Sequence, residues 1–201
     1  MKKYSVFLCI ALVFLISGCA PDMAVKPGYD FSRIRRIAVL NFEGSGADGV
    51  ADLFIMELLK AGFDIAERSH LENLLKEQDM GLSGRLDPST VKNIGKMLGV
   101  DAILMGSVIG YAPAQKRVVY FALGDTPVIT PGLLVVERGI NYIVYQVDAE
   151  VSISARMVDV ETGSVVWAAR DSYRGFTTEN ALLTVVFFLS DSLKSVFPKK
   201  K

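Results

Sequence analysis

The sequence predicts an α/β fold, a three-layer-like sandwich in which helices flank a mixed β-sheet, with a projecting β-hairpin insert. Three observations support this prediction. In the first half of the chain, short apolar runs typical of strands alternate with segments of helical periodicity. Near residue 160 two strands meet at a turn, and a long amphipathic helix follows them. Between these two parts lies a stretch, about residues 113 to 147, that matches neither pattern.

The domain begins with a strand, a helix and a second strand. Apolar residues predict strands over 34–42 and 63–67, and helical periodicity predicts a helix over 50–61. The buried face of this helix is expected to consist of Ala51, Phe54, Ile55, Leu58 and Gly62. Leu53 and Met56 fall outside that face, so they are either additional core contacts or part of a subunit interface.

Two more helices are expected before the central strand. A capping box that starts at Ser69 begins one of them. Asp87 as N-cap and Pro88 at the first position begin the other, and Gly99 ends it. The apolar stripe of this second helix consists of Val91, Ile94 and Leu98. The mostly apolar run over 102–111 then predicts a strand in the centre of the sheet.

The last part of the domain is predicted as a β-hairpin and a helix. Alternating apolar and polar residues over 151–157 indicate a strand with one buried face, and residues 165–173 return beside it. Gly163 supplies the positive φ that the turn between them needs. A helix over 179–196 is expected to cover the sheet. Its buried register is Leu182, Val185, Val186, Leu189, Leu193 and Val196.

Residues 1–18 have the features of an export signal: a basic start, a short apolar run and small residues before Cys19. The apolar run is shorter than the roughly 20 residues that span a membrane. The cysteine directly after Ser17-Gly18 resembles the lipobox of bacterial lipoproteins. The alternative is an ordinary cleaved signal with an incidental cysteine.

The lipobox resemblance implies where the mature chain lies. The resemblance implies that Cys19 becomes the first residue of the mature chain, with acyl chains such as palmitate on its sulfur and on its amino group. The residue after it is Ala20 and not Asp, which favours the outer membrane over the inner one. Residues 19–32, which contain Pro21, Pro27 and Gly28, would then form a lipid-anchored tether to a domain over 33–197.

Composition excludes several kinds of site. The chain has 22 basic and 22 acidic residues, and loss of Lys2 and Lys3 with the signal leaves no basic surplus for nucleic acid. Cys9 leaves with the signal and Cys19 would carry lipid, so neither a disulfide nor a thiolate ligand remains. His70, the single histidine, cannot complete a Cys/His zinc site within one chain. We therefore expect no catalytic residue, no metal and no cofactor besides the covalent lipid.

The glycines at 44, 46 and 49 spell G-x-G-x-x-G between a predicted strand and helix, as in dinucleotide-binding folds. However, Glu43 and Asp48 would place carboxylates where a pyrophosphate binds, and Asp48 also suits the N-cap of the helix. We therefore predict that Gly44, Gly46 and Gly49 serve a turn.

Four segments resemble the CsgG family of curli secretion lipoproteins. They are "RIAVLNFE", "ADLFIMELLKAGFDIAERSHLENLLKEQ", "LGVDAILMGSVIGY" and "VSISARMVDVETGSVVWAAR". The resemblance implies an outer-membrane lipoprotein whose domain faces the periplasm and assembles into a homo-oligomeric ring that exports unfolded protein, without enzyme activity. The sequence departs from the channel type twice. Only residues 44–49 stand where that type has a long pore-narrowing loop, and residues 174–177 replace its second membrane hairpin.

The insert over residues 113–147 is where we expect function to concentrate. Its flanks, 117–123 and 140–147, are rich in β-forming residues, and the prolines and glycine of 126–132 separate them. The flanks nearly reach the length of membrane strands, about 9–11 residues, but their apolar and polar residues alternate poorly. Such a ribbon could insert in lipid, pack on a neighbouring subunit, dock a partner, or fold back on the core. The candidate interface residues are Val118, Tyr120, Tyr142 and Val144, together with Leu53 and Met56.

Three functions remain open at this point. The first is an oligomeric lipoprotein that forms or supports an assembly for curli-like secretion or cell-surface assembly. The second is a periplasm-facing adaptor that binds a protein partner, such as a cell-wall synthase or an appendage base, without forming a pore. The third is an enzyme that uses the glycine loop.

Overall fold

The structure, a computed structural model, describes residues 21–66, 88–120 and 142–198. The strands of its main sheet are β1 (Asp22–Val25), β2 (Arg36–Val39), β3 (Asp64–Ile65), β4 (Ala102–Ala112), β7 (Ala149–Asp159) and β8 (Val165–Gly175). The helices in these ranges are the 3-10 helix η1 (Phe31–Arg33) and the α-helices α2 (Val50–Lys60), α4 (Pro88–Leu98) and α5 (Thr178–Ser195). The strand order is β1-β8-β7-β4-β2-β3, with β2 parallel to β3 and β4 and the other pairs antiparallel. The predicted α/β fold with a mixed sheet is confirmed.

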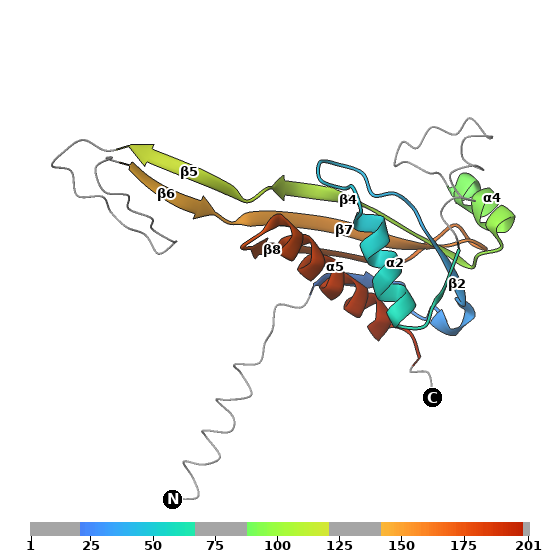
Figure 1. Ribbon diagram of the computed structural model, residues 1–201. Coiled ribbons are helices and arrows are strands. Elements are labelled where there is room, and N and C mark those ends of the chain that lie inside the picture. The colour runs from blue at the N-terminus through green and yellow to red at the C-terminus, as the bar shows by residue number, and fades with distance from the viewer. Residues whose placement is uncertain (1–20, 67–87, 121–141, 199–201) are drawn as a thin grey trace, which may run out of the picture.

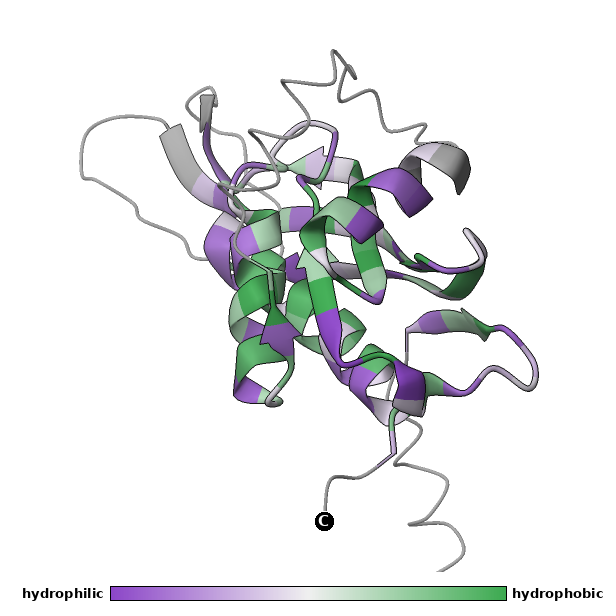
Figure 2. Ribbon diagram, turned by 90° about the vertical axis from the view of Figure 1, so that its right-hand side faces the viewer, coloured by the Kyte–Doolittle hydropathy of each residue, from purple (hydrophilic) through white to green (hydrophobic). Residues whose placement is uncertain are grey.

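Helices cover the sheet on both faces (Figures 1 and 2). Because side chains alternate along a strand, Ile37 and Val39 of β2 join the core under α2 and α5. Ala38 and Leu40 join a second core on the opposite face, where Ile94 of α4 is fully buried. This arrangement is the predicted three-layer sandwich.

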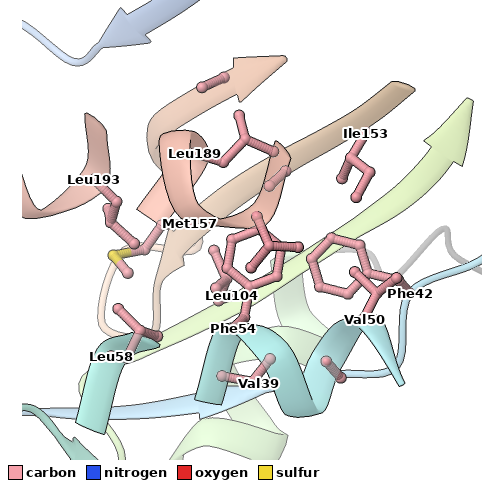
Figure 3. Packing of buried hydrophobic residues seen from close by; sticks show 14 of the residues in the cluster. Val39, Phe42, Val50, Phe54, Leu58, Leu104, Ile153, Met157, Leu189 and Leu193 are labelled. Carbon is pink, nitrogen blue, oxygen red and sulfur yellow. The ribbon is translucent and has the colours of Figure 1, made fainter. Parts of the chain in front are cut away.

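The larger core lies between the sheet and the pair α2 and α5 (Figure 3). Phe54 of α2 is fully buried and stacks on Phe42, with ring centroids 4.9 Å apart. Leu193 of α5 and Met157 of β7 are also fully buried in it. Burial of such side chains contributes about 1.5–3 kcal/mol each, so this interface is the main source of stability.

Helix α5 follows the predicted register. Thr177 is its N-cap, and the Thr177 hydroxyl accepts a hydrogen bond from the Asn180 amide at 3.1 Å. Four of the predicted core residues are buried, and two pack partly buried against the core. The buried ones are Val185, Val186, Leu189 and Leu193, and the others are Leu182 and Val196. None of the helices in the described ranges is long and apolar enough to cross a membrane.

The predicted tether over residues 19–32 is wrong for its described part. Residues 22–25 form β1, an edge strand that pairs antiparallel with β8, and the Asp22 carboxylate lies 2.9 Å from Nε of Arg170. Phe31 is buried against the core. The folded domain therefore begins at about residue 22. The two prolines that suggested a tether flank the strand and do not interrupt it.

The remaining predicted elements agree with the structure, with shifted ends. Within α2, Ala51, Phe54 and Leu58 are buried as predicted, but Gly62 lies beyond the helix end and is exposed. Strand β2 is shorter than the predicted 34–42, and β4 extends one residue past the predicted 102–111. Gly99 ends α4 and Gly163 occupies the hairpin turn, both with positive φ. The helix expected at Ser69, and His70 with it, lie outside the described residues.

Candidate functional site

The predicted hairpin insert leaves the body of the domain as a separate two-stranded sheet, β5 (Gln115–Tyr120) and β6 (Tyr142–Val147). It continues the line of β4 and β7 and projects beyond the helices (Figure 1). Among the described strands, β5 and β6 pair only with each other. Their outer edges therefore present backbone N–H and C=O groups to which another strand could pair.

The register brings four of the predicted interface residues together. Val118 lies opposite Val144, and Tyr120 lies opposite Tyr142. Because side chains alternate along a strand, these four positions share one face of the hairpin. The opposite face carries Val119 and Ile143 as a further apolar pair. Beyond the polar base, where Gln115, Lys116, Arg117 and Gln146 lie, both faces of the ribbon carry apolar pairs, so apolar and polar residues do not alternate there.

Two hydrogen bonds fix the base of the hairpin to the start of α5. The Ala114 amide donates to the Thr178 hydroxyl at 3.1 Å, and Gln146 Nε2 donates to the Phe176 carbonyl at 2.6 Å. Just inside the base, an exposed ion pair at 2.8 Å joins Arg174 of β8 to Glu150 of β7. The core thus holds the base in place while the strands extend away from it.

The structure gives Leu53 and Met56 different surroundings, although the sequence pattern placed both outside the buried face of the helix. Leu53 is partly buried and packs against the main core, so it is a core contact. Met56 is 40% exposed, and Leu59 beside it on α2 is 54% exposed. Only Met56 of the two remains a surface candidate.

Sequence reasoning missed the apolar surface that α5 adds to this helical layer. Leu183, Phe187 and Phe188 are exposed although their neighbours on the helix are buried. The signal was present, because residues 182–189 are apolar at all positions but Thr184, more than one buried face requires. We define the helical patch as Met56, Leu59, Leu183 and Phe187.

Charged groups mark the seam between α2 and α5. Glu57 is buried, and its carboxylate lies 2.7 Å from Lys60 Nζ and 3.8 Å from Lys194 Nζ. The Lys194 ammonium also lies over the Phe187 ring, 5.6 Å from its centroid. Lys60 belongs to α2 like Glu57, so the Lys194–Glu57 pair is the one of the two that joins α5 to α2, and the helical patch lies at the surface.

The glycine loop is explained by packing. A Cβ at Gly44 would lie 2.4 Å from the Val108 carbonyl oxygen, and a Cβ at Gly46 would overlap the Tyr111 ring. Gly49 is itself the N-cap of α2 in the left-handed conformation, without a side-chain cap. The expectation that Asp48 caps the helix is therefore wrong. All three glycines have positive φ, so the backbone of this turn requires them.

Hydrogen bonds to the Asp159 carboxylate fix the N-terminal segment to the β7–β8 turn. The Tyr29 hydroxyl donates to the Asp159 carboxylate at 2.5 Å, and Thr162 donates to it through its amide and hydroxyl. Burial raises the pKa of Asp159, but these hydrogen bonds outweigh burial and hold that pKa below its ordinary value. Burial, followed by the bond to Asp159, raises the pKa of the Tyr29 hydroxyl. The network is structural, since it satisfies one buried carboxylate.

A hollow of about 590 Å³ lies between η1 and the C-terminal ends of α2 and α5. Phe31, Phe63 and Phe197 form its aromatic wall. Among the residues that line it, Asp64 is the one acid, and its carboxylate lies 3.5 Å from Nε of Arg36. In the described ranges, no three His, Cys, Asp or Glu residues gather closely enough to hold a metal ion.

A mixed sheet between helices, extended by a hairpin with open edges, is the architecture of this domain. The chain belongs to the family described as curli production assembly/transport component CsgG, whose family model matches residues 24–181. The resemblance drawn from the sequence is therefore confirmed. No curated protein matches the sequence.

Solved structures of similar fold have low sequence identity. A PelC dodecamer from Paraburkholderia phytofirmans is 13% identical, with TM-score 0.47, over 85% of this chain and 96% of that chain. Lipoprotein GNA1162 from Neisseria meningitidis is 19% identical, with TM-score 0.48, over 80% and 95%. The LpoB C-terminal domain from Salmonella enterica is 14% identical, with TM-score 0.43, over 73% and 86%. At identities of 19% or less, none of them defines a function for this chain.

Proposed function

We propose that this chain is an outer-membrane lipoprotein, acylated at Cys19, whose periplasmic domain forms or supports a homo-oligomeric assembly for curli-like protein secretion or cell-surface assembly. Family membership supports the class of function. The observation that carries the proposal for this chain is the β5–β6 hairpin, which has unpaired edges among the described strands and a base held by α5. In this proposal the domain acts by assembly and needs neither catalysis nor a cofactor.

The hairpin suits an assembly because its apolar residues have no partner sheet within the described chain. An open strand edge pairs readily with a strand of another chain, and apolar cross-strand pairs stabilise such contacts. A neighbouring copy of the chain would supply both a strand edge and apolar residues for such cross-strand pairs. The helical patch offers a second contact on each subunit, since Met56, Leu59 and Phe187 are between 40% and 54% exposed.

An adaptor that binds a protein partner without forming a pore is the second candidate. One observation favours it. Strand β8 ends at Gly175 and α5 begins at Thr178, so no second hairpin lies between them. One projecting hairpin and one helical patch, as the described residues show, also fit a partner-binding role.

The size of the detergent-extracted, full-length protein separates the two candidates. An assembly predicts a closed oligomer of uniform mass by light scattering, with ring-shaped particles in negative-stain micrographs. A monodisperse monomer at all protein concentrations would contradict the assembly and favour the adaptor.

Substitution of the acylated residue tests the anchor. Cys19→Ser should yield an uncleaved or soluble chain that no longer sediments with outer membranes, because one sulfur is the attachment site. The intact mass of the wild-type protein should show the acyl groups. Unchanged fractionation of Cys19→Ser, at the mass of a normally processed chain, would contradict lipidation.

Nucleotide titration tests the absence of a cofactor site at Gly44, Gly46 and Gly49. We expect millimolar NAD or ATP to leave the melting temperature unchanged. A real site at about 100 times its dissociation constant would add about 2.7 kcal/mol to the free energy of unfolding. A concentration-dependent rise in melting temperature would instead favour the hypothesis that the chain is an enzyme that binds a nucleotide at the glycine loop.

A further inference from the structure

The loop between β8 and α5 carries an unusually exposed aromatic side chain. Phe176 is 61% exposed, a value above that of every other large apolar side chain whose exposure the structure describes. Tyr173 and Val147, each 36% exposed, lie on strands that end beside this loop. One exposed apolar side chain is ordinary, but several at the same end of a sheet mark a candidate contact surface.

The loop is held in a fixed position. Gln146 Nε2 donates to the Phe176 carbonyl at 2.6 Å, which ties the loop to the base of the hairpin. Thr177 caps α5, and a Cβ at Gly175 would lie 2.9 Å from the Ala181 amide nitrogen. The backbone on both sides of Phe176 therefore packs closely on the first turn of α5.

The position of β1 limits the distance between this end of the sheet and an acylated Cys19. Strand β1 begins at Asp22, three residues after Cys19. Three extended residues span at most about 10 Å. A chain anchored at Cys19 thus holds its edge strand close to the bilayer surface.

The direction of β1 points the anchor toward the Phe176 loop. Because β1 is antiparallel to β8 and Asp22 lies opposite Arg170, the chain that precedes Asp22 departs toward the Gly175 end of β8. At about 3.4 Å per residue, Gly175 lies about 17 Å beyond Arg170 in that direction. This offset exceeds the reach of the three connecting residues. If β8 points at the membrane, Phe176 would therefore lie at least as close to the lipid as Cys19 does.

We propose that the loop at residues 175–177 is a second membrane contact, in which Phe176 inserts into a phospholipid surface beside the acyl chains. The inference rests on the proposed acylation of Cys19. It adds the orientation of the domain, with the β8–α5 loop and the hairpin base at the lipid and α4 at the far end (Figure 1).

The charges around the loop indicate that the contact is apolar. The adjoining segments carry as many basic as acidic side chains, namely Lys116, Arg117 and Arg174 against Asp148, Glu150 and Glu179. Without a net charge, the surface has no electrostatic preference for anionic lipid. Binding should depend on the exposed phenyl ring and hardly on the headgroup charge.

A single labelled cysteine measures the depth of the loop. Cys9 lies in the signal and Cys19 is the proposed acylation site, so Phe176→Cys introduces the only free thiol of the acylated chain. The full-length protein, labelled there with an NBD fluorophore, is reconstituted in phosphatidylcholine vesicles with or without spin-labelled lipid. Met97→Cys is the matched control, because Met97 is 44% exposed on α4.

We expect blue-shifted emission and strong quenching by spin-labelled lipid at position 176, and aqueous emission without quenching at position 97. Replacing part of the phosphatidylcholine with an anionic lipid should leave both signals unchanged. Aqueous emission at position 176, or equal quenching at both positions, overturns the inference.

The intact mass of the same sample tests the proposed function separately. Acylated protein with an unquenched label at 176 supports the anchor and overturns the loop contact. If the mass shows no acyl groups, the proposed anchor fails. Cys9 and Cys19 are then replaced by serine in both labelled variants, so that quenching confined to position 176 would still support the loop contact and its absence would overturn that contact as well.

Discussion

Strands β4 and β7 and strands β5 and β6 are successive stretches of one ribbon, yet they meet different surroundings. In β7, buried residues such as Val151 and Ile153 alternate with the half-exposed Ser152 and Ser154, because helices cover one face. In the hairpin, neighbouring positions 118 and 119 are both valine, and no other described strand pairs with either edge. Alternation records a covered face within the chain, and its loss in the same ribbon is what we expect if the hairpin packs against another chain, as we propose.

The largest loss of stability should follow a change in the core side of this comparison. Phe54→Ala removes a fully buried ring that stacks on Phe42. We expect the free energy of unfolding to fall by about 3–5 kcal/mol, as for other buried aromatic truncations. Urea denaturation checks this value. A loss below about 1 kcal/mol would mean that the core is not where the structure places it.

The glycine turn should come next, because it holds the chain against β4. Gly44→Ala combines a positive φ with a Cβ 2.4 Å from a backbone oxygen, so we expect a loss of about 2–4 kcal/mol. Gly49→Ala is the matched control. Its φ is also positive but the space around it is open, so about 1–2 kcal/mol should be lost. Equal melting temperatures for the two variants would contradict the packing explanation.

The third change concerns the segment that the sequence assigned to a tether. Tyr29→Phe removes a donor to the Asp159 carboxylate, and hydrogen bonds to charged groups contribute about 1.5–3 kcal/mol. Because the folded pKa of Asp159 is lowered, its contribution is present above the unfolded pKa, about 3.9. It is lost as the pH falls through the lower folded value.

The stability difference between wild type and Tyr29→Phe should therefore narrow below about pH 4. Unfolding curves from pH 7 down to the acid transition measure it. A difference that stays constant or grows in acid would show that the hydroxyl does not stabilise the ionised carboxylate.

The smallest effect on stability is expected in the helical patch. Leu59 is 54% exposed and its neighbour Leu58 is fully buried. Leu59→Ser should change the free energy of unfolding by at most about 0.5 kcal/mol, whereas Leu58→Ala should cost about 2–5 kcal/mol. If the patch is a subunit contact, the double variant Met56→Ser, Leu59→Ser should keep the fold and shift the oligomer toward smaller species.

The layers of the fold could be predicted from the sequence because periodicity reports directly which faces are covered. The registers of α2 and α5 and the alternation of β7 are examples. Strand β1 could not be predicted in this way. Its four residues lie between prolines, and its stability comes from pairing with β8, a contact 148 positions away between Asp22 and Arg170.

The candidate site was only partly accessible from sequence. The hairpin and its four paired positions followed from composition, but Leu53 and Met56 could not be separated, because both lie outside the main stripe by spacing alone. The exposure of Phe187 and Phe176 was hidden for a different reason. An apolar residue in a helix or beside a strand is predicted as core unless the surrounding chain is already known to leave it uncovered.

Replacement of the hairpin beyond its anchored base tests the central claim most directly. Residues 117–145 give way to a short Gly/Ser linker, while Ala114 and Gln146 keep their hydrogen bonds to the start of α5. The account predicts an unchanged melting temperature, normal processing at Cys19, and loss of the wild-type oligomer in light scattering. An unfolded variant would show that the hairpin belongs to the core, and a folded variant with the wild-type oligomer would show that assembly does not use it.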